Sequence, residues 1–366
     1  MNISASKSDL SRAVALAAAV ADRKSTIPIV GNILLVADAD GLTVSATDLT
    51  ISVQSRCAAK VSAPGGTTLP AKLLHDVVRS VAGDSIDLKF LDGARVQIAS
   101  GKSRHAIAAL PADQFPKLQV PPDAWSTMPA EALADIIAKT LHSCSNDETR
   151  YHLNGVLLES ADGILRGVST DGHRLSKVER KCDGLALPAS LLVPRKALAE
   201  IAKLLGDKTV EVAATSAYVF VRAGGVTLSA KLIEAQFPPY AQVIPAKTKR
   251  TAIVDRARLL DGIRRVSILA PESTAGVQVS LAAGSLTLKS ENPETGEAVE
   301  EIETDYSGDD VSIGFNARYL EEALSRVGCA DVEVRMSGEL DPCIIRGTSQ
   351  AEGADFLSVV MPMRNR

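Results

Sequence analysis

The feature that most constrains the fold of this 366-residue chain is a pattern that occurs three times along it. Three apolar-periodic stretches open with a residue suited to a helix start: Pro70, Pro194 and Asn316, which lie 124 and 122 positions apart. Proline has no backbone N–H to leave unpaired in a first helical turn, and asparagine can cap free N–H groups. The spacing predicts three copies of one domain-sized unit.

Other landmarks repeat at the same interval. Glycines at positions 31, 155 and 276 each lead into an apolar, strand-like run, and Thr47-Asp48 recurs as Thr170-Asp171. Phe115-Pro116 recurs as Phe237-Pro238, and we match it with Met361-Pro362 in the last unit. Because the order of the landmarks is kept, each unit should contain the same elements in the same order.

Each unit is expected to contain two helices and several period-two strands. The first helices are expected at residues 9–21, 130–142 and 256–265, and the second helices at 70–81, 194–205 and 316–327. Stretches rich in proline and polar residues give the expected domains: 1–122, 123–246 and 247–366. The predicted fold class is α+β, with three similar domains that each pack two helices on antiparallel sheets.

Similar domains joined head to tail repeat one rotation, so a series of them closes into a ring or continues as a filament. Three domains can form half of a ring, which a second copy would complete. The sequence therefore favours a homodimer in which the first domain of one subunit contacts the third domain of the other.

Composition limits the possible functions. The chain contains no run of eighteen or more apolar residues that would suggest a membrane span. Its first seven residues lack the apolar core of a secretory signal, so the cytoplasm is the expected compartment. The five cysteines are odd in number and form no C-x-x-C pair, which predicts reduced, buried or partly buried thiols.

The formal net charge is −4, whereas a typical DNA-binding protein is basic overall. Lys and Arg nevertheless recur on the predicted helices, and acidic residues concentrate between positions 291 and 310. Basic helices inside an acidic rim would fit a hole filled by DNA. Ordinary solvated helix faces explain the same pattern, so the charges alone leave both interpretations open.

Motifs for catalysis are missing. Gly101-Lys102-Ser103 ends like a phosphate-binding loop, but the required first glycine is replaced by Val96. The pair Asp171 and His173 suits a hydrolase, yet no nucleophile motif accompanies it. We therefore expect no intrinsic catalytic activity, no cofactor and no metal.

Several longer segments carry a family resemblance. They are residues 150–159 (RYHLNGVLLE), 169–176 (STDGHRLS), 231–240 (KLIEAQFPPY), 314–316 (GFN) and 359–364 (VVMPMR). In order and over essentially the whole chain, they resemble the bacterial DNA polymerase III beta sliding clamps. The resemblance implies a processivity factor: a homodimeric ring with helices lining the pore, which encircles double-stranded DNA during replication.

The resemblance also implies a pocket that receives short linear motifs of the polymerase III alpha subunit, the clamp loader, other polymerases and repair proteins. Its implied residues are Leu153, Thr170, Gly172, His173, Arg174, Leu175, Pro238, Val243, Asn316, Tyr319, Val359, Met361, Pro362, Met363 and Arg364. Apolar anchors of such motifs need a preformed groove, and methionine adapts to varied side chains. Gly172 would allow a tight turn beside the groove. Gln242 stands where the family often has a basic residue.

Two further sets of residues follow from the resemblance. DNA-binding residues would be Lys24, Lys72, Asp147, Arg150, Tyr151 and His152, and dimer-interface residues would be Arg104, His105, Ile107, Ile268, Leu269, Glu300 and Glu301. Contacts of Lys or Arg with phosphates would not depend on DNA sequence. Lys24 and Lys72 keep the charge of the usual arginine but lose its forked geometry. A partner-binding adaptor that does not encircle DNA would share the pocket and is the alternative.

Overall fold

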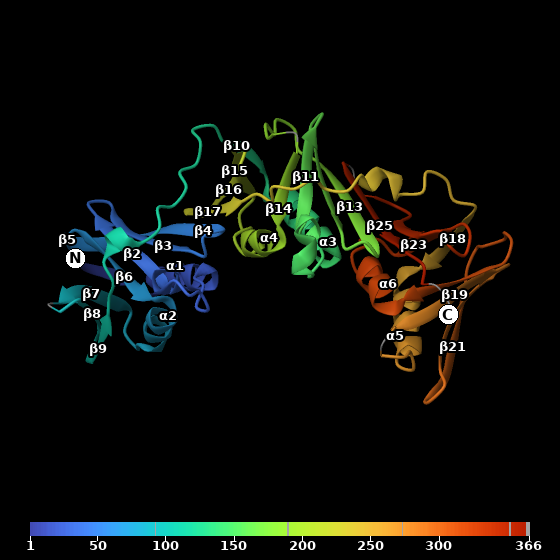
Figure 1. Ribbon diagram of the computed structural model, residues 1–366, viewed down its shortest axis with the longest axis horizontal. Coiled ribbons are helices and arrows are strands. Elements are labelled where there is room, and N and C mark those ends of the chain that lie inside the picture. Colours follow the sequence, from blue (N-terminus) through green and yellow to red (C-terminus); the bar gives the residue numbers. More distant parts are fainter. Residues whose placement is uncertain (92, 189, 273, 351–352, 364–366) are drawn as a thin grey trace. The chain divides into compact units, whose positions relative to one another are not determined.

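The computed structural model describes residues 1–91, 93–188, 190–272, 274–350 and 353–363 (Figure 1). The chain forms two compact units. The first consists of Met1–Glu131 and Lys196–Leu232, and the second of Ala132–Arg195 and Ile233–Arg366.

The first unit contains two antiparallel sheets. Its eight-stranded sheet has the order β10 (Ser126–Pro129), β15 (Thr209–Ala214), β16 (Tyr218–Ala223), β17 (Val226–Lys231), β4 (Ile51–Cys57), β3 (Gly41–Thr47), β2 (Asn32–Asp38), β6 (Gly65–Pro70). Its five-stranded sheet has the order β5 (Ala59–Ala63), β1 (Asn2–Ser6), β7 (Ser85–Leu91), β8 (Arg95–Ser100), β9 (Ser103–Ala108). Helices α1 (Lys7–Val20) and α2 (Ala71–Ser80) pack on each other. Helix α4 (Arg195–Ala202) lies almost wholly within this unit.

The second unit repeats this plan. Its eight-stranded sheet has the order β14 (Ser190–Pro194), β11 (Gly155–Ala161), β12 (Ile164–Thr170), β13 (Arg174–Lys181), β25 (Ala354–Val360), β24 (Cys343–Gly347), β23 (Asp331–Met336), β18 (Arg250–Asp255). Its four-stranded sheet has the order β21 (Gly296–Glu303), β20 (Ser285–Asn292), β19 (Gly276–Ala282), β22 (Val311–Asn316). The helices are α3 (Ala130–Thr140), which begins in the last residues of the first unit, α5 (Arg256–Ser267) and α6 (Ala317–Leu324).

The strand order confirms three similar domains of the α+β class. One four-strand set occurs as β1-β7-β8-β9, β10-β15-β16-β17 and β18-β23-β24-β25; the other occurs as β6-β2-β3-β4, β14-β11-β12-β13 and β22-β19-β20-β21. Each eight-stranded sheet arises where two sets pair antiparallel, through β17 with β4 and through β25 with β13. Consequently β9 and β21, the equivalents of these pairing strands, remain edge strands of the described sheets.

Helix starts follow the local chemistry expected from the sequence. The side chain of Asn316 accepts hydrogen bonds from the backbone N–H groups of Arg318 and Tyr319, which caps α6. Ser6 and Asp255 cap α1 and α5 in the same way. The six predicted helices are all present, with ends within a few residues of the expected positions.

One sequence landmark is wrong. Ser52 pairs with Ser229 across β4 and β17, and the equivalent residue Leu175 pairs with Val359 across β13 and β25. Val359 therefore corresponds to Ser229, and Met361 corresponds to Lys231 of the central domain. Met361-Pro362 therefore follows its strand directly, whereas Phe237-Pro238 comes six residues after β17. The two pairs look alike in sequence but are not structurally equivalent.

Four cysteines are buried and Cys329 is partly exposed. Among the residues that the structure describes, no helix is long and apolar enough to cross a membrane. The short 3-10 helices are η1 (Pro28–Gly31), η2 (Ala112–Gln114), η3 (Leu141–Ser143), η4 (Glu148–Leu153) and η5 (Tyr240–Gln242).

Candidate functional site

One face of the eight-stranded sheet in the second unit carries an apolar surface, which we call the groove face. Two rows of directly opposed residues form it, and each row crosses three strands: Leu192–Leu157–Val168 and Leu175–Val359–Ile344. Directly opposed residues of an antiparallel sheet project from the same face, so these side chains form one buried cluster. The opposite face packs on α3, where a Cβ at Gly167 would lie 2.3 Å from Ile136 Cγ2.

The chain segment after β17 forms a wall over this cluster. Phe237 belongs to the cluster, and Ile233, Tyr240 and Ile244 pack against it. The rings of Phe237 and Tyr240 meet edge to face with centroids 6.4 Å apart. The predicted residues Pro238 and Val243 lie in this wall, and Val243 is 41% exposed. The wall therefore offers apolar side chains beside a buried apolar floor.

A tight turn between β12 and β13 borders the groove. The hydroxyl of Thr170 donates to the Arg174 carbonyl (2.6 Å), and Asp171 Oδ1 accepts from the backbone N–H groups of His173 (2.9 Å) and Arg174 (3.1 Å). Gly172 has a φ of +90°, which a residue with a side chain rarely adopts. This confirms that the turn makes use of a glycine.

Arg174 connects this turn to α6. Its guanidinium donates to Asp171 Oδ2 (3.0 Å), to the Glu322 carboxylate and to the His142 carbonyl, and it lies 4.4 Å from the centre of the Tyr319 ring. Burial alone would raise the pKa of Glu322, but the hydrogen bonds from Arg174 and then Arg318 hold that pKa below its ordinary value. The ion pairs therefore fix the turn against α6.

His142 lies behind this network. Burial first, then the positive charges of Arg174 and Arg326, lower the pKa of His142 to about 4. Its Nε2 lies 3.3 Å from Ser176 Oγ. The ring is therefore neutral at physiological pH.

The predicted residues on the third domain lie near the same turn. The ring of His173 stacks on Tyr319 with centroids 6.4 Å apart, and the Met361 N–H donates to the His173 carbonyl (2.9 Å). The Met363 N–H donates to the Gly314 carbonyl (2.7 Å), and Pro362 is partly exposed. Leu153 is buried at the end of η4. Arg364 lies outside the described residues.

A polar cleft extends this site toward η4. Its lining combines residues proposed for partner binding with residues proposed for DNA binding, namely Asp147, Arg150, His173, Arg174, Asn316 and Tyr319, among others. Arg150 donates to the Asp171 carbonyl (2.9 Å) and to Asp147 Oδ2 (3.3 Å). The two predicted sets of residues therefore meet within one unit.

Sequence reasoning missed part of the groove. Leu157, Val168, Leu192, Phe237, Tyr240 and Ile344 belong to it or pack against it but were not predicted. The apolar residues of β11 and β12 predict strands with buried side chains, but they do not reveal which strands are neighbours. Ile344 needed the pairing of β24 with β25, which no local pattern reveals.

The equivalent face in the first unit has a different chemistry. The residues at the positions of Leu175, Val359, Val168 and Leu192 are Ser52, Ser229, Ser45 and Thr68, whereas Leu157 and Ile344 have the apolar equivalents Leu34 and Phe220. Thr68 there accepts a hydrogen bond from Asn32 Nδ2 (2.9 Å). The repeat of the backbone is therefore not a repeat of the apolar groove.

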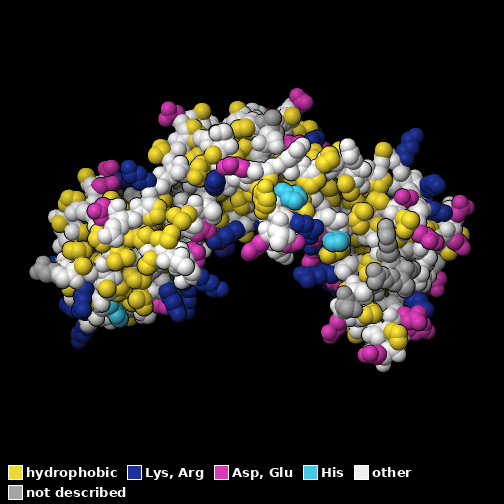
Figure 2. Space-filling model, viewed as in Figure 1, with side chains coloured by type: hydrophobic (Ala, Val, Ile, Leu, Met, Phe, Trp, Pro, Cys, Tyr) yellow, Lys and Arg dark blue, Asp and Glu magenta, His cyan; other side chains and the backbone are white. Residues whose placement is uncertain are grey.

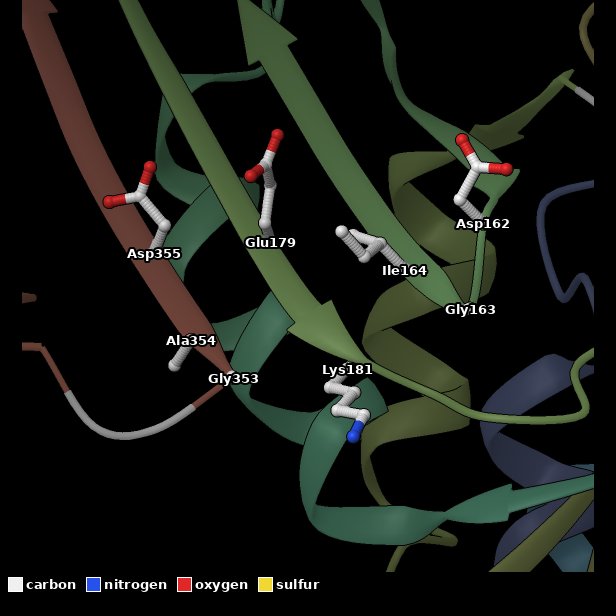
Figure 3. Close-up of a pocket in the computed structure, with 8 residues that line it drawn as sticks. All are labelled: Asp162, Gly163, Ile164, Glu179, Lys181, Gly353, Ala354 and Asp355. Atoms are coloured by element: carbon white, nitrogen blue, oxygen red, sulfur yellow. The ribbon is translucent and has the colours of Figure 1, made fainter.

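The groove face continues beyond the apolar cluster as rows of charged residues. Glu159, Arg166, Glu179 and Asp355 are successive opposed residues on β11, β12, β13 and β25. A hollow at the far end is lined by Ile164, Lys181 and Ala354, with Glu179 and Asp355 projecting from the same side of the sheet (Figure 3). The described residues contain no group of three His, Cys, Asp or Glu placed to hold a metal ion.

The other proposed DNA-binding residues lie at helix ends and in loops. Lys24 follows α1 and Lys72 lies in the first turn of α2, and both side chains are exposed. Figure 2 shows Lys and Arg side chains gathered beside α1 and α2 on the face in view. In the second unit, Tyr151 is 58% exposed and meets His152 edge to face at 6.0 Å.

The proposed interface residues lie on or beside the two free edges. Arg104, His105 and Ile107 are on β9, and Ile107 is buried. Ile268 and Leu269 follow α5, and Ile268 is 78% exposed. Glu300 and Glu301 are on β21. Glu300 already pairs with Arg265 of the same chain (Nε to Oε2, 3.1 Å), and Glu301 accepts from Ser285 Oγ (2.8 Å).

Comparisons with known proteins agree along the whole chain. Residues 1–119, 127–239 and 241–364 match the N-terminal, central and C-terminal domains of the DNA polymerase III beta subunit. The beta sliding clamp of Pseudomonas aeruginosa is 32% identical over 373 residues, with full coverage of both chains. That of Caulobacter vibrioides is 34% identical, covering 94% of this chain and 95% of the relative.

Solved structures give the same result. The DNA polymerase III subunit beta from P. aeruginosa superposes with a TM-score of 0.94 at 30% identity and covers all of both chains. The P. aeruginosa sliding clamp bound to griselimycin has a TM-score of 0.93 at 30% identity, again with full coverage of both chains.

Proposed function

This chain belongs to the family of DNA polymerase III beta subunits, the bacterial sliding clamps, and we propose that two copies close a ring around duplex DNA. In that ring the chain would tether the replicative polymerase to its template. We propose that it acts in the cytoplasm as an accessory protein and has no catalytic activity of its own.

The strand order is the observation that carries the ring proposal. Two of the three possible junctions between four-strand sets are made within the chain, by β17 with β4 and by β25 with β13. The third needs β9 and β21, which are both unpaired edges of the described sheets. An edge strand offers a row of free N–H and C=O groups to another chain. A second copy would supply the missing pairing twice, once at each end, which is what closes a ring.

Side chains beside these edges support the same contact. Ile268 and Leu269 offer apolar surface next to the β21 edge, and Ile107 lies on β9. Acidic side chains on β21 face solvent, and Arg104 on β9 carries the opposite charge. Apolar burial should dominate the stability of the dimer, because exposed ion pairs contribute little.

DNA contacts are proposed to be electrostatic and independent of sequence. Lys24 and Lys72 are exposed, and Arg150, Tyr151 and His152 share the η4 region with Asp147. Lysine and arginine at such positions bind phosphates without reading bases, so the ring would be free to slide. Tyr151 offers an exposed ring on which a base can stack.

The groove of the second unit is the proposed docking site for partners. Its floor is apolar, and its wall contains Pro238 and the half-exposed Val243. Four of the six equivalent floor positions in the first unit are polar. Short linear motifs of the polymerase, the clamp loader and repair proteins would place apolar anchors there. We also expect griselimycin, which is bound to the P. aeruginosa clamp, to bind here.

Assembly state tests the ring. Sedimentation should show a dimer for the wild type and a monomer for Leu269→Asp, because a buried charge would face the apolar part of the interface. Leu340→Asp is the matched control: Leu340 is 75% exposed and lies outside the proposed interface, so this variant should remain a dimer. A wild-type monomer at micromolar concentration would favour an adaptor that does not encircle DNA.

Topological retention tests the encirclement. Once loaded by a clamp loader, the protein should stay on a nicked circular plasmid and leave the same plasmid after one cut. Equal loss from both forms would reject a ring that holds DNA by enclosing it.

A further inference from the structure

We propose that Glu159 and Arg166, which lie outside the groove, position its wall through the hydroxyl of Tyr240 and thereby set the affinity for partners. This inference rests on the proposed docking role of the groove. It assigns a function to charged residues of the sheet that no apolar anchor of a partner would touch.

Tyr240, Glu159 and Arg166 form a connected network that extends to Glu179 and Lys177. The Tyr240 hydroxyl donates to Glu159 Oε2 (2.6 Å), and Arg166 Nη1 donates to the same carboxylate oxygen (3.2 Å) and to the Tyr240 oxygen (3.3 Å). Arg166 Nε donates to Glu179 Oε1 (2.6 Å), which Lys177 Nζ also contacts at 2.8 Å. Figure 3 shows Glu179 projecting from β13, and its pairing with Arg166 places it on the groove face. Three strands of the sheet therefore hold one tyrosine.

Tyr240 is central to the wall. Its N–H donates to the Pro238 carbonyl (2.7 Å), and its own carbonyl accepts from the Val243 N–H (3.0 Å). The wall residues Pro238 and Val243 are thus tied to Tyr240 by backbone hydrogen bonds. A shift of Tyr240 would move both.

Backbone bonding gives the wall little other support. The N–H groups of Ala235, Tyr240, Gln242 and Val243 all donate to carbonyls two or three residues earlier in the same segment. The segment is joined to the sheet at its start, where the Ile233 N–H donates to the Leu192 carbonyl (2.9 Å). Side chains must therefore hold η5 in place, and Phe237 and Tyr240 are the aromatic ones.

The hydrogen bond between Tyr240 and Glu159 should persist in the free protein. Burial first, and then the hydrogen bond to Glu159, raise the pKa of Tyr240, so its hydroxyl keeps its proton and donates. A hydroxyl donating to a carboxylate is stronger than a bond between neutral groups. Without these hydrogen bonds, the wall is displaced in a fraction of the molecules, and those molecules do not bind. The apparent dissociation constant then equals the intrinsic one divided by the fraction of molecules whose wall is in place.

The first experiment removes only the hydroxyl. Tyr240→Phe keeps the ring against Phe237 and should weaken griselimycin binding by about three- to tenfold, mainly through faster dissociation. Amide hydrogen exchange in residues 240–244 should become faster in the free protein. Tyr218→Phe is the control, because Tyr218 lies on β16 in the first unit, and it should change neither quantity.

The second experiment varies the acceptor. Glu159→Gln keeps an oxygen that can accept from Tyr240 but loses the charge that strengthens the bond, so its affinity should lie between those of the wild type and Glu159→Ala. Glu159→Ala removes it and should match Tyr240→Phe in both affinity and exchange. A role limited to general stability would lower the unfolding free energy of Glu159→Ala in urea without faster exchange in the wall of the native protein.

The outcomes separate the two proposals. Faster exchange with weaker binding in Tyr240→Phe and Glu159→Ala supports the positioning role. Unchanged exchange, or unchanged affinity, in those variants while the wild type binds griselimycin would overturn it and leave the docking groove standing. Failure of the wild type itself to bind griselimycin would overturn the assignment of the groove and this inference with it.

Discussion

The guanidinium of Arg150 donates a hydrogen bond to the backbone carbonyl of Asp171 at 2.9 Å. This bond joins the loop proposed for DNA binding to the turn that borders the groove. Arg150 Nη1 also lies 3.2 Å from the position that a Cβ at Gly172 would take. One arginine is therefore available either to a phosphate or to the turn.

Replacing Arg150 should affect both proposed activities. In Arg150→Ala the turn loses a donor, so griselimycin should bind about two- to tenfold more weakly. Phosphate binding should also weaken, and the slope of log K against log salt should fall by about one for this lost contact. Fluorescence anisotropy with labelled duplex, and with griselimycin as a separate ligand, measures the two effects.

Lys72→Ala is the matched control for Arg150→Ala. Lys72 is exposed on α2 in the first unit, so its loss should lower the salt slope in the same way and leave griselimycin affinity unchanged. Equal griselimycin affinity in Arg150→Ala and Lys72→Ala would show that Arg150 does not support the turn.

Any side chain at position 172 should lower the stability of the protein. In Gly172→Ala a residue with a Cβ must adopt a φ of +90°, which costs on the order of 1–3 kcal/mol. The turn between Thr170 and Arg174 should relax, and griselimycin binding should weaken with it. Urea unfolding and a griselimycin titration measure the two changes.

Gly184→Ala separates strain from function. Gly184 also has a positive φ, of +77°, but apart from its two chain neighbours no other residue that the structure describes has an atom within 4 Å of its Cβ position, and it follows the end of β13 that is far from the turn. Its replacement should lower stability and leave griselimycin binding unchanged. If both variants lose stability and neither loses affinity, the turn does not shape the groove.

The repeat in the sequence predicted the domain plan because its signals are local. A capping Asn316, a helix-opening proline and alternating strands each depend on neighbours within a few residues. The same local signals suggested that Met361-Pro362 matches Phe237-Pro238, which the strand register contradicts. Local similarity cannot reveal that two strands pair across domains.

The groove was predictable only in part for the same reason. Leu175 and Val359 were found through family segments, but Ile344 and Tyr240 were not. Ile344 reaches the groove because β24 pairs with β25, and Tyr240 because its hydroxyl meets Glu159 some eighty positions away in sequence. Such contacts depend on the packed fold. The assignment of Glu300 to the dimer interface likewise did not include its contact with Arg265 of the same chain.

The Arg265–Glu300 pair changes the expectation for the dimer. Because Glu300 already has a partner on α5, its hydrogen bonds with Arg265 hold the pKa of its carboxyl below the ordinary value without a second subunit. Glu300→Gln should therefore leave the dimer dissociation constant within about twofold. Ile268→Asp should raise it by more than about tenfold, since it places a charge in apolar surface.

A dilution series in the analytical ultracentrifuge measures these constants. Repeating it for the wild type at high salt should give little change, because screening weakens exposed ion pairs and not apolar contacts. A dimer that dissociates at high salt, or in Glu300→Gln, would mean that charges hold the subunits together.

His142 should make the second unit sensitive to mild acid. Its pKa is about 4 in the folded chain, because burial and then Arg174 and Arg326 disfavour the charged ring, whereas an unfolded histidine titrates near 6.5. The unfolded state therefore binds the proton first. The stability is fully present above about pH 6.5, declines as the pH falls toward 4, and declines no further through this group below that value.

At pH 5 the loss amounts to about 2 kcal/mol relative to pH 7.5. His142→Gln removes the titrating group. Between pH 7.5 and pH 5 its unfolding free energy, measured in urea, should therefore fall by about 2 kcal/mol less than that of the wild type. His152→Gln is the control: His152 is only partly buried, in η4, and its variant should follow the wild type. An identical pH dependence in all three proteins would mean that the ring of His142 accepts a proton in place, because the fold can then hold a charged imidazole between Arg174 and Arg326.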